Sequence, residues 1–362
     1  MKTVKVRLGK RSYPIYIGKG ATEKLFSHIT SRIDNRPIFV VTNRKINTLH
    51  GRKLKKFLRP LTRRIRFYEV PDSEKAKSFS VYTKAISVLA HFARKIRPLV
   101  IAFGGGVVGD LAGFLASTYR RGVPYINIPT TLLAQVDSSI GGKVAIDIKG
   151  AKNIIGNFYQ PSAVACDFRF LKTLPEKELR NGLVETLKYG IIKDVRLFSF
   201  IDKNLKKILS LDHASLEYIV YAASSIKARI VGRDEFDNKD LRVILNFGHT
   251  IGHAIEAASG YSRSVAHGRA VAYGMLAASL IALRMGILKK EDNDKINALI
   301  RKVLSPKIKG VRPKAILSAL LYDKKFVRGV NKFILPKKIG RVKIVENIPQ
   351  KLIEEVLREG VR

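Results

Sequence analysis

The histidines are the first residues of the chain whose spacing points to chemistry. Three of the seven fall within nineteen residues, and two of these share the segment NFGHTIGH, Asn246 to His253. His249 and His253 are four residues apart, so on a helix both imidazoles lie on one face. The spacing is that of the HExxH zinc pattern, although Thr250 stands where that pattern has a general-base glutamate. We interpret the group as a metal site, against the alternative that each histidine is structural.

The histidine pair needs a further ligand, because a catalytic zinc ion usually has three from the protein. His267 lies nearby in the sequence, and Glu185, in NGLVETLKYG, is another candidate. A glutamate on an otherwise apolar helix face needs a polar or charged partner. The residues alone leave open which of these side chains bind the metal.

A glycine-rich loop is the second feature that could carry chemistry. The sequence GGGVVGDLAGF, Gly104 to Phe114, follows an apolar run and opens a helical pattern. Glycines at this spacing let backbone amides approach a pyrophosphate. The acidic ribose partner of a dinucleotide fold is missing about twenty residues later, since the first acid after Asp110 is Asp137. The loop therefore indicates either a nucleotide or phosphate site or a tight structural turn.

The segment IPTTLLAQVDSSIGGKVAIDIKGAKNIIGNF is dense in polar groups. Thr130, Thr131, Asp137 and Lys143 lie in its first part, and Lys152 with Asn153 in its second. Hydroxyl, carboxylate, amide and ammonium groups at this density suit a site that binds a polyol and an anion. The alternative is a set of turns with solvated lysines.

The elements that must position these residues change in character along the chain. Strand-like runs at 36–43, 64–72, 97–106 and 125–130 alternate with helical patterns, which predicts a parallel sheet covered by helices. Ligands of such sheets bind at the carboxyl ends of the strands, where the glycine and threonine loops fall. After about residue 172 helical periodicity dominates. We expect an α/β domain at 1–172 and a mostly α-helical domain at 173–362.

Composition limits the class of protein. Cys166 is the single cysteine, so no internal disulfide forms and a reducing, cytoplasmic location is expected. No signal peptide or membrane-spanning run is found. The net charge of +39 is spread along the chain. It indicates a solvated basic surface that could steer an anionic substrate, or a second role on nucleic acid or membrane. Because the basic residues are spread along the chain, the solvated surface is favoured.

Taken together, these segments resemble the 3-dehydroquinate synthase family. The likeness covers most of the chain and rests on GGGVVGDLAGFLASTYRRG, IPTTLLAQVDSSIGGK, KNIIGNFYQP, NGLVETLKYG, LNFGHTIGHAIE and HGRAVAYGM. The string PTTLLAQVDSSIGGK is highly specific to this family and to its sugar-phosphate cyclase relatives.

The resemblance implies two cofactors and their ligands. A divalent metal, usually zinc with cobalt as the alternative, would bind Glu185, His249 and His267. NAD would bind the α/β domain through Asn43, Glu74, Lys77, Gly105, Gly106, Asp110, Thr130, Thr131 and Lys152. Asn43 stands where the family often has aspartate, Arg269 where an acid follows the third ligand, and Ala151 where glycine is common.

The resemblance also implies the residues that meet the substrate. The catalytic groups would be Asp137, Lys143, Asn246 and His253, the last as a proton relay. Substrate contacts would come from Asn153, Lys188, Lys227, Arg242 and either Lys324 or Lys325. Arg121 corresponds to an arginine that reaches the neighbouring subunit's site, so a homodimer is expected.

The implied reaction converts 3-deoxy-D-arabino-heptulosonate 7-phosphate to 3-dehydroquinate. NAD oxidises the C5 hydroxyl while the metal polarises its oxygen, phosphate leaves by elimination, the hydride returns, and an intramolecular aldol step closes the ring. The expected partner is thus a small anionic sugar phosphate, with no membrane or nucleic acid. The alternatives are a sibling cyclase, whose substrate lacks the carboxylate that Lys227 and Arg242 would bind, and an NAD-dependent polyol or glycerol-phosphate dehydrogenase.

Overall fold

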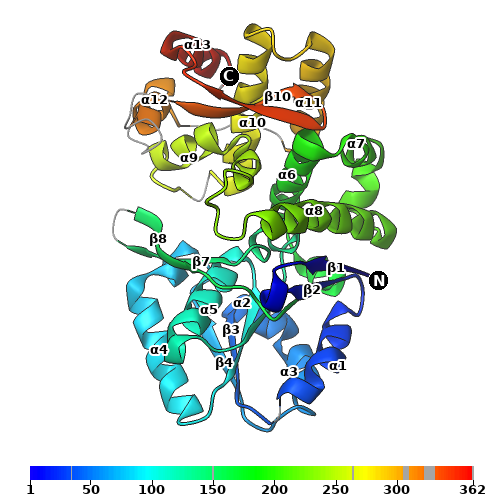
Figure 1. The fold of residues 1–362 in the computed structure, drawn as a ribbon, viewed down its shortest axis with the longest axis vertical. Coiled ribbons are helices and arrows are strands. Elements are labelled where there is room, and N and C mark those ends of the chain that lie inside the picture. Colours follow the sequence, from blue (N-terminus) through cyan, green and yellow to red (C-terminus); the bar gives the residue numbers. More distant parts are fainter. Residues whose placement is uncertain (34, 149–150, 263–264, 305–309, 322–330, 361–362) are drawn as a thin grey trace. The chain divides into compact units, whose positions relative to one another are not determined.

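The chain forms two compact units. The computed structural model describes residues 1–33, 35–148, 151–262, 265–304, 310–321 and 331–360 (Figure 1). Unit 1 comprises Met1–Pro175 and Leu211–Phe236, and unit 2 comprises Glu176–Ser210 and Asp237–Arg362. These units differ from the division expected at residue 172 in one segment, because the helical residues 211–236 pack with the α/β unit.

Unit 1 is built on a seven-stranded sheet in the order β1-β2-β9-β6-β5-β3-β4. The strands are β1 (Lys2–Val6), β2 (Tyr13–Ile17), β3 (Ile38–Asn43), β4 (Ile65–Val70), β5 (Leu99–Gly104), β6 (Tyr125–Pro129) and β9 (Ala163–Cys166). Only β1 and β2 pair antiparallel; every other neighbouring pair is parallel. The predicted parallel sheet is confirmed, and β3 to β6 fall inside the four runs expected to be strands.

Helices and one separate hairpin complete unit 1. The helices are α1 (Ala21–Ile33), α2 (Arg44–Ile46), α3 (Arg52–Leu58), α4 (Phe79–Ala93), α5 (Gly106–Thr118) and α8 (His213–Arg233). Short helical turns are η1 (Gly9–Arg11), η2 (Asn47–Gly51), η3 (Glu74–Lys77), η4 (Tyr119–Arg121), η5 (Ala134–Ser138) and η6 (Phe168–Thr173). The antiparallel hairpin pairs β7 (Lys143–Ile148) with β8 (Ala151–Phe158).

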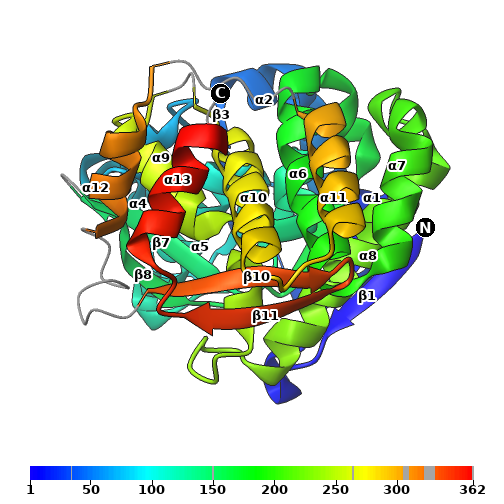
Figure 2. The same cartoon turned by 90° about the horizontal axis from the view of Figure 1, so that it is seen from above.

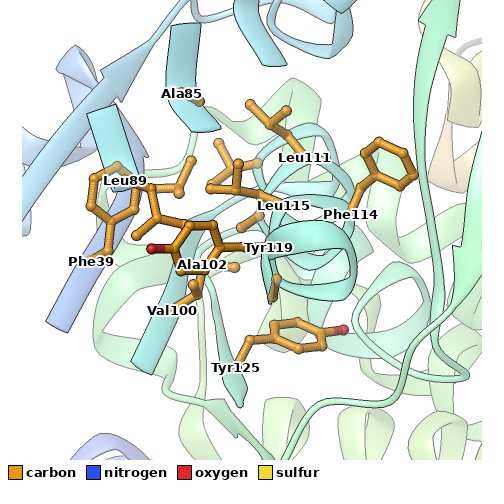
Figure 3. Close-up of a cluster of buried hydrophobic side chains, with 14 of the residues drawn as sticks. Phe39, Ala85, Leu89, Val100, Ala102, Leu111, Phe114, Leu115, Tyr119 and Tyr125 are labelled. Atoms are coloured by element: carbon orange, nitrogen blue, oxygen red, sulfur yellow. The ribbon is translucent and has the colours of Figure 1, made fainter. Parts of the chain in front are cut away.

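The β3 side chains show how the sheet is covered on both faces. Successive residues of a strand point to opposite faces. One face buries side chains of β3, α1 and α3, namely Ile38, Val40, Leu25 and Leu54. The other buries side chains of β3, α4 and α5, namely Phe39, Val41, Leu89 and Leu111 (Figure 3). Each fully buried large side chain contributes roughly 1.5–3 kcal/mol, so two cores hold the strand ends in place.

Unit 2 is mostly helical and is centred on α10 (His267–Arg284). Its other elements are α6 (Glu176–Lys193), α7 (Val195–Leu209), η7 (Arg242–Asn246), α9 (His249–Ala258), α11 (Lys290–Val303), α12 (Pro313–Leu321), α13 (Gln350–Gly360) and the antiparallel hairpin of β10 (Lys332–Lys338) and β11 (Arg341–Glu346). Figure 2 shows α10 between α6 and α13. It also packs against α9, α11 and β10. This agrees with the helical second half that was expected.

None of the helices in the described residues is long and apolar enough to cross a bilayer.

Candidate functional site

Glycines bring the start of α9 against the middle of α10. Gly248, just before α9, has φ +79°, which strains any L side chain. A Cβ on Gly248 would lie 2.5 Å from the Met275 Cγ, and a Cβ on Gly274 would lie 1.8 Å from the Gly248 carbonyl oxygen. The two backbones therefore almost touch. With the helices this close, the ring of His249, the first residue of α9, lies 5.4 Å between centroids from that of His267, the first residue of α10.

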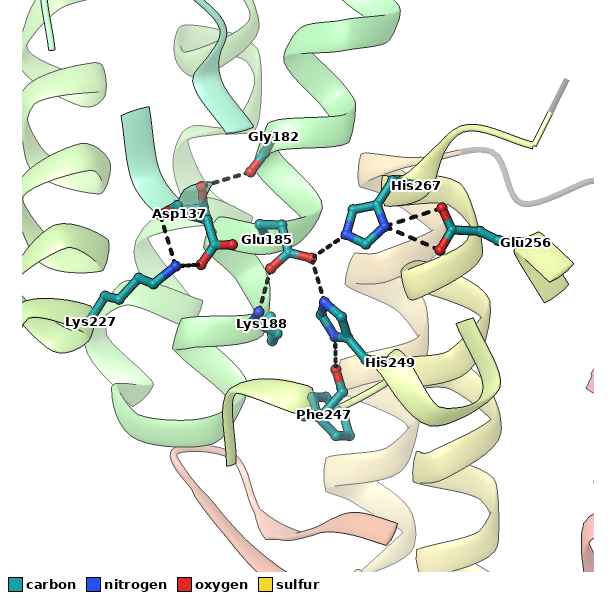
Figure 4. Close-up of polar contacts among 10 residues, drawn as sticks. Asp137, Gly182, Glu185, Lys188, Lys227, Phe247, His249, Glu256 and His267 are labelled. Atoms are coloured by element: carbon teal, nitrogen blue, oxygen red, sulfur yellow. Dashed lines mark hydrogen bonds and ion pairs between the residues drawn. The ribbon is translucent and has the colours of Figure 1, made fainter. Parts of the chain in front are cut away.

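Glu185 of α6 completes a group of three potential ligands (Figure 4). Its Oε1 lies 3.6 Å from His249 Nε2 and 3.7 Å from His267 Nε2. These distances are too long for good hydrogen bonds. Two ligands of a tetrahedral zinc ion, each about 2.1 Å from the metal, lie about 3.4 Å apart. The three side chains are thus spaced as ligands around one ion.

The environment of Glu185 is the test of whether a metal fits. The residue is fully buried, and neither carboxylate oxygen accepts a hydrogen bond from any described residue. The ammonium of Lys188, also buried, forms an ion pair with it. Lys188 contacts Oε2, and Oε1 has no hydrogen-bond donor among the described residues. Such a buried acceptor is costly, and a divalent cation between Oε1 and the two imidazoles would offset that cost. The donor set therefore fits a metal such as zinc.

His249 is oriented and neutral, as a metal ligand must be. Its Nδ1 lies 3.2 Å from the carbonyl oxygen of Phe247, so Nδ1–H donates there and Nε2 faces Glu185. Burial lowers the pKa of His249 well below the ordinary value, and the charge of Lys188 lowers it further. Imidazole binds metal in the neutral form.

His267 lies between two carboxylates. Its Nδ1 is 3.4 Å from both oxygens of Glu256 of α9. Burial lowers the pKa of His267, but the hydrogen bond and charge of Glu256, with the charge of Glu185, outweigh burial and raise it. His253, Glu256 and His267 form a second group of potential ligands, in which His253 is exposed. The buried group is the one that the sequence predicted, and Glu256 was missed. Its position three residues after His253 could have revealed it.

In unit 1 the glycine loop occupies the carboxyl end of β5. Gly104 ends β5, Gly106 begins α5, and the amide of Thr130 donates to the Gly104 carbonyl at 2.9 Å. A Cβ on Gly106 would lie 2.9 Å from Ser138 Oγ, and one on Gly105 would lie 3.2 Å from Thr131. The loop thus leaves bare backbone at the N-terminus of a 13-residue helix, a setting that binds pyrophosphate. These residues fit a dinucleotide.

Lys77 gathers several of the predicted cofactor residues. It is buried, and its ammonium lies 2.8 Å from Asp110, 3.5 Å from Glu74 and 3.9 Å from Asp147. Burial opposes the charge of Lys77, but the three carboxylates outweigh it and raise the pKa.

Two residues of the β7–β8 hairpin join this cluster. Lys152 pairs with Glu74 at 3.7 Å, and the Asn153 side chain accepts a hydrogen bond from Lys77. The backbone amide of Asn153 donates to Asp147 Oδ1 at 2.7 Å. This hydrogen bond supports the left-handed backbone of Asn153, whose φ is +55°. The structure therefore brings a predicted substrate residue, Asn153, to the predicted cofactor residues. Asp147 was missed, since nothing in its sequence context marks it.

Asn43 caps the short helix that follows β3. Its Oδ1 accepts from the Ile46 amide and its Nδ2 donates to Asp72, both at 2.8 Å. A carboxylate therefore stands beside the residue where the family often has its own aspartate.

The remaining predicted residues divide between the units. In unit 1, Lys227 of α8 donates to Asp137 Oδ1 at 2.7 Å and to its carbonyl at 2.8 Å. Lys143 begins β7, and exposed Arg121 ends η4. In unit 2, buried Arg242 begins η7 and half-buried Asn246 ends it. Lys324 and Lys325 lie outside the described residues.

Two family models match the chain. The model of the 3-dehydroquinate synthase N-terminal domain covers residues 67–181, and that of the C-terminal domain covers residues 182–326. The 3-dehydroquinate synthase of Desulforamulus reducens is 42% identical over 361 residues, which covers 99% of this chain and 100% of the relative.

Solved structures of sugar-phosphate cyclases share the fold. A 2-deoxy-scyllo-inosose synthase complexed with carbaglucose-6-phosphate, NAD+ and Co2+ has a TM-score of 0.88 at 26% identity, covering 99% of this chain and 100% of that one. ValA, the 2-epi-5-epi-valiolone synthase of Streptomyces hygroscopicus subsp. jinggangensis 5008 with NAD+ and Zn2+ bound, has a TM-score of 0.86 at 26% identity, covering 96% of each chain. The matches to both synthase models and the near-complete relative at 42% identity decide between the branches: the chain belongs to the 3-dehydroquinate synthase family.

Proposed function

We propose that this chain performs the family's reaction, from 3-deoxy-D-arabino-heptulosonate 7-phosphate to 3-dehydroquinate and phosphate, with a bound NAD and a bound divalent metal. The observation that carries the proposal is Glu185, a fully buried carboxylate with two imidazoles at the spacing of metal ligands and the ammonium of Lys188 beside it. Unit 1 would hold NAD at the β5–α5 loop, and unit 2 would hold the metal at Glu185, His249 and His267.

The two cofactors divide the chemistry. When bound, NAD takes up and returns a hydride at the substrate C5 carbon, and the metal polarises the C5 oxygen as a Lewis acid. The relatives crystallised with NAD+ and Zn2+ or Co2+ support this assignment. Zinc is the metal we propose, because two imidazoles and one carboxylate form a usual catalytic zinc set.

The chain's own residues would bind the anionic substrate and move its protons. Lys143 and Lys227 of unit 1, and separately Arg242 of unit 2, would bind its anionic groups, since phosphate and carboxylate favour ammonium and guanidinium partners. Asp137 holds the Lys227 ammonium through two contacts and so fixes its position. His253, exposed on α9, would relay protons to and from the substrate.

Assembly and location complete the proposal. Arg121 is exposed and follows Arg120, whose guanidinium donates at 2.7 Å to the carbonyls of both Arg94 and Lys95. An exposed arginine beside this anchored residue suits the expected role in a partner subunit's site, so we propose a homodimer. A single buried cysteine suits the reducing cytoplasm.

Phosphate release tests the proposal. Purified enzyme, stripped of metal and then given the heptulosonate phosphate, NAD and zinc, should release one phosphate per substrate while NADH absorbance stays flat. Omitting NAD or adding a chelator should stop the release. Steady accumulation of NADH without phosphate would instead identify a dehydrogenase.

A further inference from the structure

Two sets of potential metal ligands in unit 2 share one residue, His267. One group contains Glu185 and His249, and the other contains His253 and Glu256. His267 faces them with different nitrogens: Nε2 is 3.7 Å from Glu185 Oε1, and Nδ1 is 3.4 Å from each oxygen of Glu256. A neutral imidazole has one lone pair and one N–H. The ring therefore coordinates a metal on one side and donates a hydrogen bond on the other.

Burial of Glu185 and the orientation of His249 indicate which nitrogen of His267 coordinates the metal. Glu185 is fully buried without a hydrogen bond to its oxygens, whereas His253 is exposed. His249, the other histidine of the buried group, already uses Nδ1 as a donor to the Phe247 carbonyl and presents Nε2 to Glu185. If His267 donates Nδ1–H to Glu256, both rings present Nε2 to the same carboxylate (Figure 4).

Helix α9 carries both a proposed metal ligand, His249, and the carboxylate that contacts His267, Glu256. His249 is at its first position and Glu256 is seven residues later, which places both side chains on one face of the helix. The Glu256 side chain is only 14% exposed, so its carboxylate is largely shielded from water, while the His267 side chain is 35% exposed. A carboxylate that accepts from a ligating histidine fixes the ring, and its loss usually costs about 10–100-fold in metal affinity.

We propose that Glu256 is a positioning residue, which accepts Nδ1–H of His267 and so turns Nε2 toward the metal centre at Glu185 and His249. The inference rests on the proposed metal site. It assigns Glu256 outside the ligand set, although the residue belongs to a group with suitable ligand spacing.

Metal affinity, measured without substrate or NAD, tests the inference. Zinc binding to metal-free protein is followed by competition with a chromophoric chelator, and the absorption bands of bound Co2+ report the ligand set. Glu256→Ala should weaken zinc binding about 10–100-fold while the cobalt bands keep the wild-type pattern. Glu256→Gln should lose less, because its amide oxygen still accepts from Nδ1–H. The control Glu291→Gln, an exposed acid in the first turn of α11, should bind as wild type does.

The outcomes separate the inference from the site on which it rests. Wild-type affinity in Glu256→Ala would overturn the inference, provided that Glu185→Gln and His249→Ala lose the metal. Loss of the metal in Glu256→Gln and His253→Ala, with Glu185→Gln still binding, would make Glu256 a ligand and would overturn the proposed metal site as well. Thermal unfolding of the metal-free variants confirms that each is folded.

Discussion

His249 and His253 lie four residues apart on one helix, yet their surroundings give them different chemistry. His249 is buried, its Nδ1 faces a carbonyl, and its pKa is held well below the ordinary value by burial and by Lys188. His253 is exposed, and its ring centroid lies 5.3 Å from that of His249. At the residue scale the i, i+4 spacing therefore brings the rings together without assigning both to the metal.

His267 and His253 should respond differently to replacement by alanine. His267→Ala removes a proposed ligand, so we expect both metal binding and turnover to be lost. His253→Ala removes a proton relay, so the metal should stay bound while kcat falls about 10²–10⁴-fold. Metal content by atomic emission, with kcat from phosphate release, checks both. Equal loss of zinc in the two variants would show that the roles are wrongly assigned.

Lys77 should matter for stability as well as for NAD. Lys77→Met removes the buried cation shared by three carboxylates, of which Glu74 keeps Lys152. We expect the free energy of unfolding to fall by about 2–4 kcal/mol, discounted because Asp110 and Glu74 are partly exposed. The folded-state pKa of Lys77 is raised above 10.5. Its contribution is therefore complete below that pH and is lost as pH rises through the folded value.

Urea unfolding of unliganded protein measures this effect. Lys75→Met, an exposed lysine of the same short helix, is the matched control and should change little. The deficit of Lys77→Met should be constant at neutral pH and shrink in strong alkali. A deficit that grew with alkalinity would contradict the sign of the shift.

At the scale of elements, hydrophobic periodicity predicted the strands and helices that local sequence determines. Apolar runs marked β3 to β6, and helical periodicity marked the part of the chain after about residue 172, where α8, α9, α10 and α13 lie. Strands β1 and β2 and the β7–β8 hairpin were not predicted. Strand β2 joins the sheet through a distant partner, with Ile15 beside Val164 of β9. Helix α8 was assigned to the helical half by its pattern alone. Its packing against β1 and η5 places it in unit 1.

Site residues that lie in the family's sequence motifs were predicted. Residues recognised only by their contacts in the folded chain were missed. Glu185, His249 and His267 were named as a set only through the family resemblance, and the structure brings them together. Asp147 contacts Asn153 and Glu256 contacts His267; no spacing in the sequence marks the first, and only the i, i+3 position after His253 marks the second.

The close approach of α9 and α10 should be needed for the metal. Gly274→Ala places a methyl group 1.8 Å from the Gly248 carbonyl, so the helices must separate. We expect a loss of roughly 1–3 kcal/mol or more in unfolding free energy and a clear loss of zinc affinity. Gly252→Ala, whose added methyl meets α10 backbone at 3.2 Å, is the milder comparison. Equal behaviour of the two variants in thermal unfolding would contradict this packing argument.

At the scale of the whole molecule, the net charge of +39 remains the feature that the reaction explains least. A substrate with both phosphate and carboxylate is attracted to a strongly basic surface, and the attraction weakens as salt screens it. The charge is therefore consistent with steering, since it is distributed along the chain.

Salt dependence of the kinetics tests steering. We expect kcat/KM to fall about tenfold between low and high ionic strength, with kcat nearly unchanged, because salt slows encounter and leaves the chemical steps alone. Sucrose at matched osmolality is the control. A flat kcat/KM would leave the charge without a role in substrate capture.

Zinc reconstitution of Glu185→Gln tests the central claim most directly. Wild-type enzyme stripped of metal should release no phosphate from the heptulosonate phosphate, and one zinc ion per chain should restore full activity. Glu185→Gln, nearly the same in shape, should neither bind that zinc ion nor regain phosphate release. Full activity of the stripped enzyme, or recovery of Glu185→Gln at the same zinc concentration, would contradict a metal centre at Glu185, His249 and His267.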